Sequence, residues 1–228
     1  MKVFHKHSIK GIAFIISSLL IVLTLVPSFT FLMTHDLINW PVSSYLLIIQ
    51  LLLSQIYFLF TQHDKPCAIP NAIILGLFEI FILICCLLIR DSLTLFTWGL
   101  LFIQCFLVHW VIITNQLAVI LPIITLASQL LMMQNVFEFT QTQLFLTSFH
   151  IVPILFNLSI ACFLALLFYE DKQGHSALLW ISSWGLFLLW LISSLFFNYQ
   201  SLKLTITMAI CLVLILVIYQ ITQRKINK

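Results

Sequence analysis

Charged side chains are scarce in this sequence. Its 228 residues include ten Lys or Arg and seven Asp or Glu, so 7% of the chain is charged, whereas a soluble domain carries about 25%. The mean hydropathy is +1.16. So few charges cannot cover a water-soluble globule of this size, and most of the outer surface must contact lipid. The basic residues lie at the ends of apolar runs rather than on one face, which argues against a nucleic-acid partner.

Glycine is also scarce, and its scarcity excludes several motifs. The five glycines form neither a phosphate-binding loop nor a GxxxG pair, and the GxSxG and HExxH patterns of hydrolases do not occur. The six cysteines contain no CxxC spacing, which would indicate a thiol-redox centre or a zinc site. We therefore expect no cofactor and no bound metal.

Long apolar runs, in contrast, fill most of the chain. A run of about 20 apolar residues can cross a bilayer as a helix, and eight such runs follow one another without a polar linker. The pattern predicts an all-α bundle of eight transmembrane helices that forms a single domain over residues 1–228. The predicted spans are 11–31, 42–61, 69–89, 93–114, 117–133, 144–169, 177–197 and 204–222.

The orientation of these spans follows from the positions of Lys and Arg, which are enriched in short cytoplasmic loops. With the N-terminus inside, eight of the ten basic residues are cytoplasmic, among them Lys65 and Lys172, and the outer loops hold only Arg90 and Lys203. An even number of spans then places both termini in the cytoplasm. We expect a bacterial inner-membrane protein whose main partner is the lipid bilayer, with a membrane protein partner or a homo-oligomer left open.

In length, span number and orientation, the chain resembles the lysoplasmalogenase-type membrane hydrolases in outline. That family carries intramembrane aspartates in Gly-Asp and Ser-Asp pairs. In this chain Asp91 follows Arg90 at a helix end, and no Ser-Asp pair occurs. The resemblance is therefore limited to topology, which does not determine function.

Glu79 stands alone among the charged residues because it lies in the middle of a run long enough to cross the bilayer. A charged side chain near the bilayer centre costs on the order of 2.5–3.5 kcal/mol on insertion scales, so such residues are rare and usually face the interior of the bundle. Glu79 lies three residues after Gly76, a small residue that permits close helix contact. We predict that Glu79 faces inward and belongs to a functional site.

Four amide side chains share the depth of Glu79. At about 1.5 Å of rise per residue, Gln50, Gln104, Gln129 and Asn157 all fall close to the bilayer midplane. His150 shares a helix face with Asn157 and is a further candidate for the same site. Two interpretations follow: a midplane solute or proton site, which is common in secondary transporters, or a set of hydrogen bonds that brace the helices.

His109 and His150 also invite comparison with a haem-binding pair. Measured by helix rise, their depths differ by more than roughly 10 Å, so they cannot ligate one iron atom. At 100° per residue, His109 faces about 140° away from Gln104, and we place it near the cytoplasmic head groups.

Three functions fit these patterns, and the sequence does not decide whether the protein is an enzyme. The first is a small-solute or proton-coupled carrier with its site around Glu79. The second is a membrane enzyme that acts on lipid, with His150 and the outer-loop acid Glu138 as an acid–base pair. The third is a non-catalytic accessory subunit of a membrane complex. A polar cavity reaching Glu79 would favour the carrier, and a lateral groove near His150 would favour the enzyme.

Overall fold

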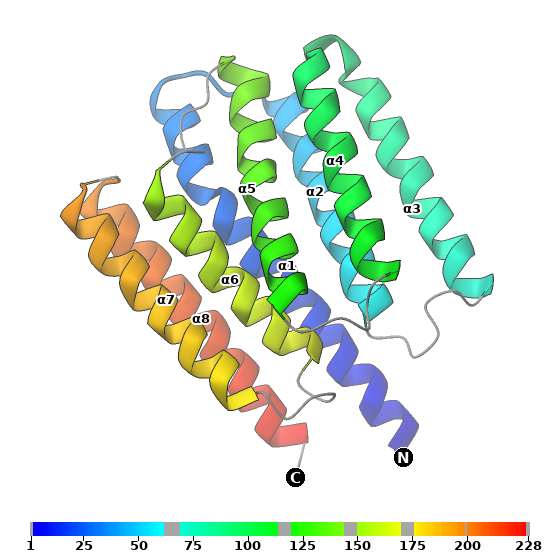
Figure 1. Ribbon diagram of the computed structural model, residues 1–228, viewed down its shortest axis with the longest axis vertical. Helices are drawn as coiled ribbons and strands as arrows, with labels where there is room; N and C mark the ends of the chain where they lie inside the picture. The colour runs from blue at the N-terminus through cyan, green and yellow to red at the C-terminus, as the bar shows by residue number, and fades with distance from the viewer. Residues whose placement is uncertain are drawn as a thin grey trace.

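The protein folds as a bundle of α-helices, as the computed structural model shows (Figure 1). The structure describes residues 2–61, 69–113, 120–143, 150–169, 176–198 and 200–226. Over these ranges there are eight α-helices and no strand, so the predicted all-α fold is confirmed. The helices are α1 (Lys2–Thr34), α2 (Trp40–Thr61), α3 (Ile69–Leu88), α4 (Leu95–Ile113), α5 (Ile120–Thr142), α6 (Ile151–Tyr169), α7 (Ser176–Phe196) and α8 (Leu202–Ile226), with a 3-10 turn, η1 (Arg90–Ser92), between α3 and α4.

Helix α5 differs most from the prediction, because it continues to Thr142 instead of ending near residue 133. Three polar residues interrupt the apolar run: Gln134, Glu138 and Gln141. Gln134 and Glu138 are hydrogen-bonded to α1, and Gln141 accepts a hydrogen bond from the backbone of Asn39, between α1 and α2. The prediction that Glu138 lies in an outer loop is therefore wrong. Its polarity is compensated by tertiary contacts, which an apolar count along the chain cannot detect.

Several predicted boundaries lie outside the described residues. These include the starts of the fifth and sixth spans, at 117–119 and 144–149, and the loops that contain Lys65 and Lys172.

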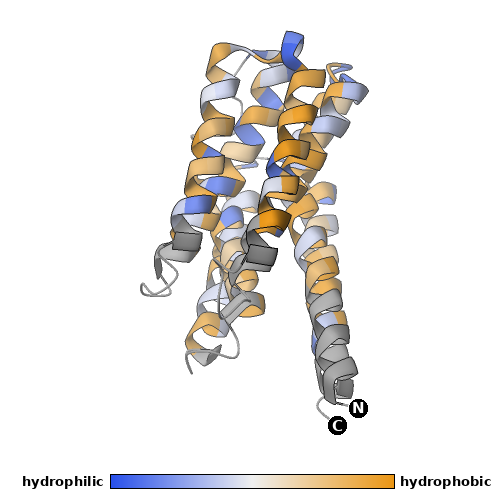
Figure 2. Ribbon diagram, turned by 90° about the vertical axis from the view of Figure 1, so that its right-hand side faces the viewer, coloured by the Kyte–Doolittle hydropathy of each residue, from blue (hydrophilic) through white to orange (hydrophobic). Residues whose placement is uncertain are grey.

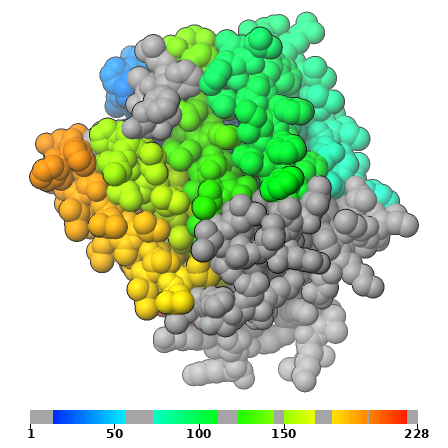
Figure 3. Space-filling model, viewed as in Figure 1, coloured from blue at the N-terminus to red at the C-terminus, as the bar shows by residue number. Residues whose placement is uncertain are grey.

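Successive helices run in opposite directions, so the two chain termini lie at the same end of the bundle (Figure 1). Helix α6 packs along α7 and α5, and α8 lies against α1. Helix α3 packs against α2 more closely than against α4, its neighbour in sequence. In the space-filling view, α3 accordingly forms the margin of the molecule beside α4 (Figure 3).

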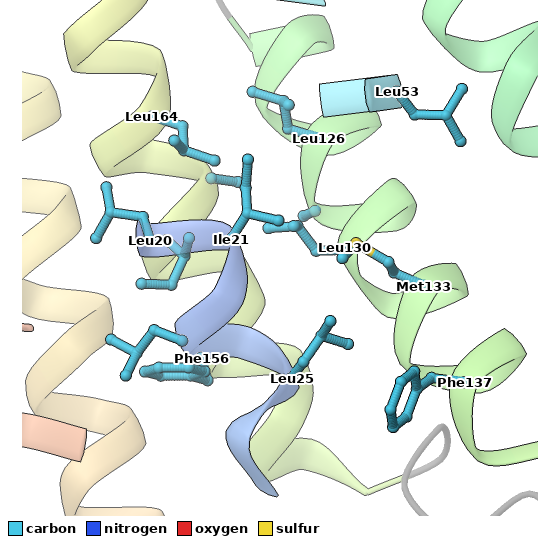
Figure 4. Close-up of a cluster of buried hydrophobic side chains, with 14 of the residues drawn as sticks. Leu20, Ile21, Leu25, Leu53, Leu126, Leu130, Met133, Phe137, Phe156 and Leu164 are labelled. Carbon is cyan, nitrogen blue, oxygen red and sulfur yellow. The ribbon is translucent and has the colours of Figure 1, made fainter. Parts of the chain in front are cut away.

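The core is built around α1, which packs against α2, α5, α6 and α8. Leu20, Ile21 and Leu25 of α1 are buried among side chains of α5 and α6 (Figure 4). Trp190 of α7 is almost fully buried between Phe156 and Phe187, with ring centroids at 4.6 and 5.5 Å. Trp190 therefore serves for packing between α6 and α7.

Apolar residues predominate along the coloured parts of the helices (Figure 2), and many of their large side chains are exposed on the outside of the bundle. Over the described residues, three apolar segments are long enough to cross a membrane: Phe14–Thr34, Leu178–Phe196 and Leu202–Ile221. Four shorter apolar helices accompany them: Trp40–Ile56, Ile73–Leu88, Leu95–Trp110 and Ile151–Leu167. Large apolar side chains remain exposed on these helices, which in water would be unfavourable. The chain is therefore a multi-pass helical membrane protein.

Candidate functional site

A cavity of about 320 Å³ lies between α2, α3 and α4 and is partly open on the flank of the bundle. We call it the α3–α4 groove. Its floor is formed by Ile49, Leu53 and Ile56 of α2; its walls are Glu79, Ile82, Leu83 and Cys86 of α3 and Trp98, Leu101, Phe102, Cys105 and His109 of α4. The groove exists because α3 and α4 both pack against α2 but contact each other little.

The lining of the α3–α4 groove is apolar except at one end. Glu79 and His109 lie at the end toward the start of α3 and the end of α4, whereas Cys86 and Trp98 lie toward the η1 turn. This combination of an apolar wall with a few convergent polar groups is typical of small-molecule sites.

Glu79 and His109 meet across the groove, with 2.6 Å between Oε1 and Nε2. A helical side chain leans toward the N-terminal end of its own helix. Because α3 and α4 are antiparallel, the two side chains lean toward each other along the bundle axis and close a difference in depth between their backbones. The pair remains partly accessible, with 45% of the Glu79 side chain and 38% of the His109 side chain exposed.

The hydrogen bonds of His109 determine how many protons the pair holds. Its Nδ1 lies 2.7 Å from the backbone carbonyl of Cys105, which can only accept, so Nδ1 carries a hydrogen. Nε2 then either accepts a proton from a neutral Glu79 or donates one to its carboxylate. In both forms one proton is shared between Glu79 and His109, and its loss would leave a carboxylate facing a nitrogen lone pair.

This arrangement differs from the predicted one. Glu79 is partly exposed on the flank of the bundle and bonds to His109 instead of joining the midplane amides. His109 in turn contacts Glu79, although we expected it to lie near the cytoplasmic head groups, away from the candidate residues. The orientation of His109 was predicted relative to Gln104 on the same helix, which gives no information about a partner on α3.

Three of the predicted amides do come together, on the opposite side of the contact between α2 and α4. Gln50 Nε2 donates to Gln104 Oε1 at 3.0 Å, and Gln104 Nε2 donates to the backbone carbonyl of Gln129 at 3.2 Å. All three side chains are buried. We call them the amide cluster; its hydrogen bonds link α2, α4 and α5, as a brace would require.

Asn157 belongs to a second group of buried polar residues between α1, α5 and α6. Its Nδ2 donates to Gln134 Oε1 at 2.9 Å, and Gln134 donates to the backbone carbonyl of Thr24. One turn further along α5, Glu138 is buried and accepts a hydrogen bond from Ser28 at 2.6 Å. The predicted fifth span ended too early, so Gln134 was missed and Glu138 was assigned to an outer loop. Their spacing of four residues, which places them on one helix face, was the available signal.

His150 lies just before α6 and is only partly buried. Its Nδ1 accepts a hydrogen bond from the backbone N–H of Val152 at 3.3 Å. Its ring and the ring of Phe197 form a T-shaped pair, with 5.5 Å between the ring centroids. The α3–α4 groove is lined by other helices, so His150 contributes nothing to it.

Among the side chains that the structure describes, no three His, Cys, Asp or Glu residues converge as metal ligands would. Comparison of the chain with protein-family models, with curated proteins and with solved structures finds no match.

Proposed function

We propose that all eight helices cross the membrane, with both termini in the cytoplasm. Two observations support this topology. The termini lie at the same end of the bundle (Figure 1), and the short segments expected at that end carry most of the Lys and Arg. The flank of the bundle on which the α3–α4 groove opens then faces lipid.

Within this topology, we propose that the α3–α4 groove binds a lipid-soluble molecule that has one apolar chain and a small hydrogen-bonding head, such as a hydroxyl group. The groove itself carries this proposal. Its lateral opening would admit a ligand directly from the bilayer, and its apolar walls match a hydrocarbon chain. From Trp98 to His109 the wall extends for about 16 Å of helix rise, enough for an extended chain with its head at Glu79 and His109.

The finer form of the proposal is proton-linked carriage of this ligand. Glu79 lies nine residues from Leu88 at one end of α3 and ten from Ile69 at the other, about halfway through the helix. A head group bound at this depth has left one interface and can reach the other. The shared proton of Glu79 and His109 would couple such a step to protonation, because the pair can release it only by breaking its own hydrogen bond.

Two tryptophan substitutions on α3 test whether the groove is the binding site. Leu83 lines the groove and Leu87 does not, yet their exposed fractions are 54% and 53%. Leu83→Trp should fill the groove and reduce equilibrium binding of tritiated hexadecanol to the purified protein at least several-fold. Leu87→Trp adds the same side chain one turn away and should leave binding unchanged. Equal binding by the wild type and Leu83→Trp would contradict the proposal.

The other two hypotheses receive less support. A lipid-cleaving enzyme centred on His150 would be favoured by a lateral groove beside that residue, but the α3–α4 groove lies beside Glu79. An accessory subunit would be favoured if Glu79 were tied to an amide in a dry core, but Glu79 bonds to His109 on the open flank.

A further inference from the structure

The amide cluster of Gln50, Gln104 and Gln129 contains hydrogen-bonding atoms that the described residues do not satisfy. Gln129 Oε1 and Nε2 and Gln50 Oε1 have no partner there, although both side chains are 1% exposed. Gln104, in contrast, uses its oxygen and its nitrogen. Two acceptors and one donor of the cluster are therefore left over at the junction of α2, α4 and α5.

Such atoms are unfavourable if nothing else binds them. A buried donor or acceptor without a partner loses the hydrogen bonds that it would make to water, and in a lipid-embedded bundle bulk water cannot compensate for this loss. Leucine would fill either position without this cost. The unpaired atoms of the cluster thus indicate that a guest molecule completes its hydrogen bonds.

The chemistry of the cluster restricts the guest. Its members are neutral amides, and a charged guest buried beside them would lack an opposite charge in the cluster, which is strongly unfavourable. The two unpaired oxygens each need a hydrogen-bond donor, and the unpaired nitrogen needs an acceptor. A water molecule supplies these and requires two to four polar partners in a buried site.

We propose that the amide cluster holds at least one ordered water molecule inside the bundle. The water lies on the core side of the contact between α2 and α4 and belongs to neither the α3–α4 groove nor its ligand. It hydrogen-bonds to the side chains of Gln50 of α2 and Gln129 of α5, in addition to the direct hydrogen bonds that run through Gln104.

Radiolytic footprinting of the intact protein tests this proposal, because X-ray pulses convert bound water into hydroxyl radicals that modify adjacent side chains. Met133 is fully buried and lies one turn after Gln129 on α5; Met208 of α8 is 1% exposed and serves as a matched buried methionine. With water in the cluster, Met133 should be modified several-fold faster than Met208 in the wild type. Equal, slow modification of both would overturn the proposal.

Two variants then assign the signal to the cluster. Each of two substitutions, Gln129→Leu and Gln50→Leu, removes unpaired polar atoms from the cluster. Both should slow the modification of Met133 to the rate of Met208. Rapid modification of Met133 that persists in both variants would show that the radicals arise elsewhere and would overturn the proposal. The wild-type comparison alone decides the question if a variant does not fold.

Discussion

Each of the two acids within the described helices, Glu79 and Glu138, has a partner from another helix, but the two surroundings differ. Glu79 is partly exposed in the α3–α4 groove and is hydrogen-bonded to His109. Glu138 is buried in the core and accepts a hydrogen bond from Ser28. An intramembrane acid is by default a functional candidate, and the accessible one is the better candidate for contact with a ligand.

The hydrogen bond between Glu79 and His109 should hold α3 and α4 together beside the groove. Glu79→Leu removes the carboxyl group. Spin labels on unnatural amino acids at Ile73 of α3 and Phe106 of α4, both on exposed positions, should therefore report a longer distance in this variant than in the wild type.

Glu79→Gln provides the control for this measurement. The amide of Gln can donate to His109 Nε2, so the distance between the labels should stay short. Equal distances in the wild type and in Glu79→Leu would contradict the role of this hydrogen bond.

The hydrogen bond from Ser28 to Glu138 should contribute measurably to stability. Ser28→Ala removes a donor to a buried carboxyl, and we expect the free energy of unfolding to fall by about 1–3 kcal/mol. Ser44→Ala is the matched control, because the Ser44 hydroxyl is exposed and bonds only to the carbonyl one turn before it. Denaturant titration in mixed micelles should show a shift for Ser28→Ala alone.

The sequence predicts which segments form helices, and how deep their residues lie, better than it predicts which helices pack against each other. Apolar length predicted eight helices, and helix rise placed Gln50, Gln104 and Gln129 at one depth, where hydrogen bonds connect these residues in the structure. The partner of Glu79 could not be predicted in this way, because it depends on α3 packing against α2 and on the lean of side chains from antiparallel helices. The extent of α5 was missed because Gln134 and Glu138 find their partners on other helices.

Trp190 of α7 is the largest buried side chain where α6 and α7 meet. Trp190 fills the space between Phe156 and Phe187, so Trp190→Ala should leave a cavity and lower the free energy of unfolding by about 3–5 kcal/mol. Leu188→Ala, on an exposed position of the same helix, should have little effect in the same denaturant titration. A similar decrease in the free energy of unfolding in both variants would contradict a specific contribution of this aromatic contact to stability.

At the scale of the whole molecule, the proposed topology makes opposite predictions for the two ends of the bundle. Green fluorescent protein fused after Lys228 should fluoresce, since it folds in the cytoplasm, and alkaline phosphatase fused after Ser92 should be active, since it folds in the periplasm. If both fusions were inactive, the topology would be the inverse of the proposed one. If the results placed both fusions on the same side of the membrane, the number of spans between them would differ from the proposed one.

Photo-crosslinking can locate the ligand in a lateral site whose polar end lies at Glu79 and His109. A hexadecanol analogue that carries a diazirine beside its hydroxyl group is bound to the protein and irradiated, and the adducts are mapped by mass spectrometry. We expect the adducts to be concentrated on groove residues near the pair, such as Glu79, Leu83 and Cys105. Adducts spread evenly over outward residues of other helices, such as Leu189 and Leu214, would contradict this location of the site.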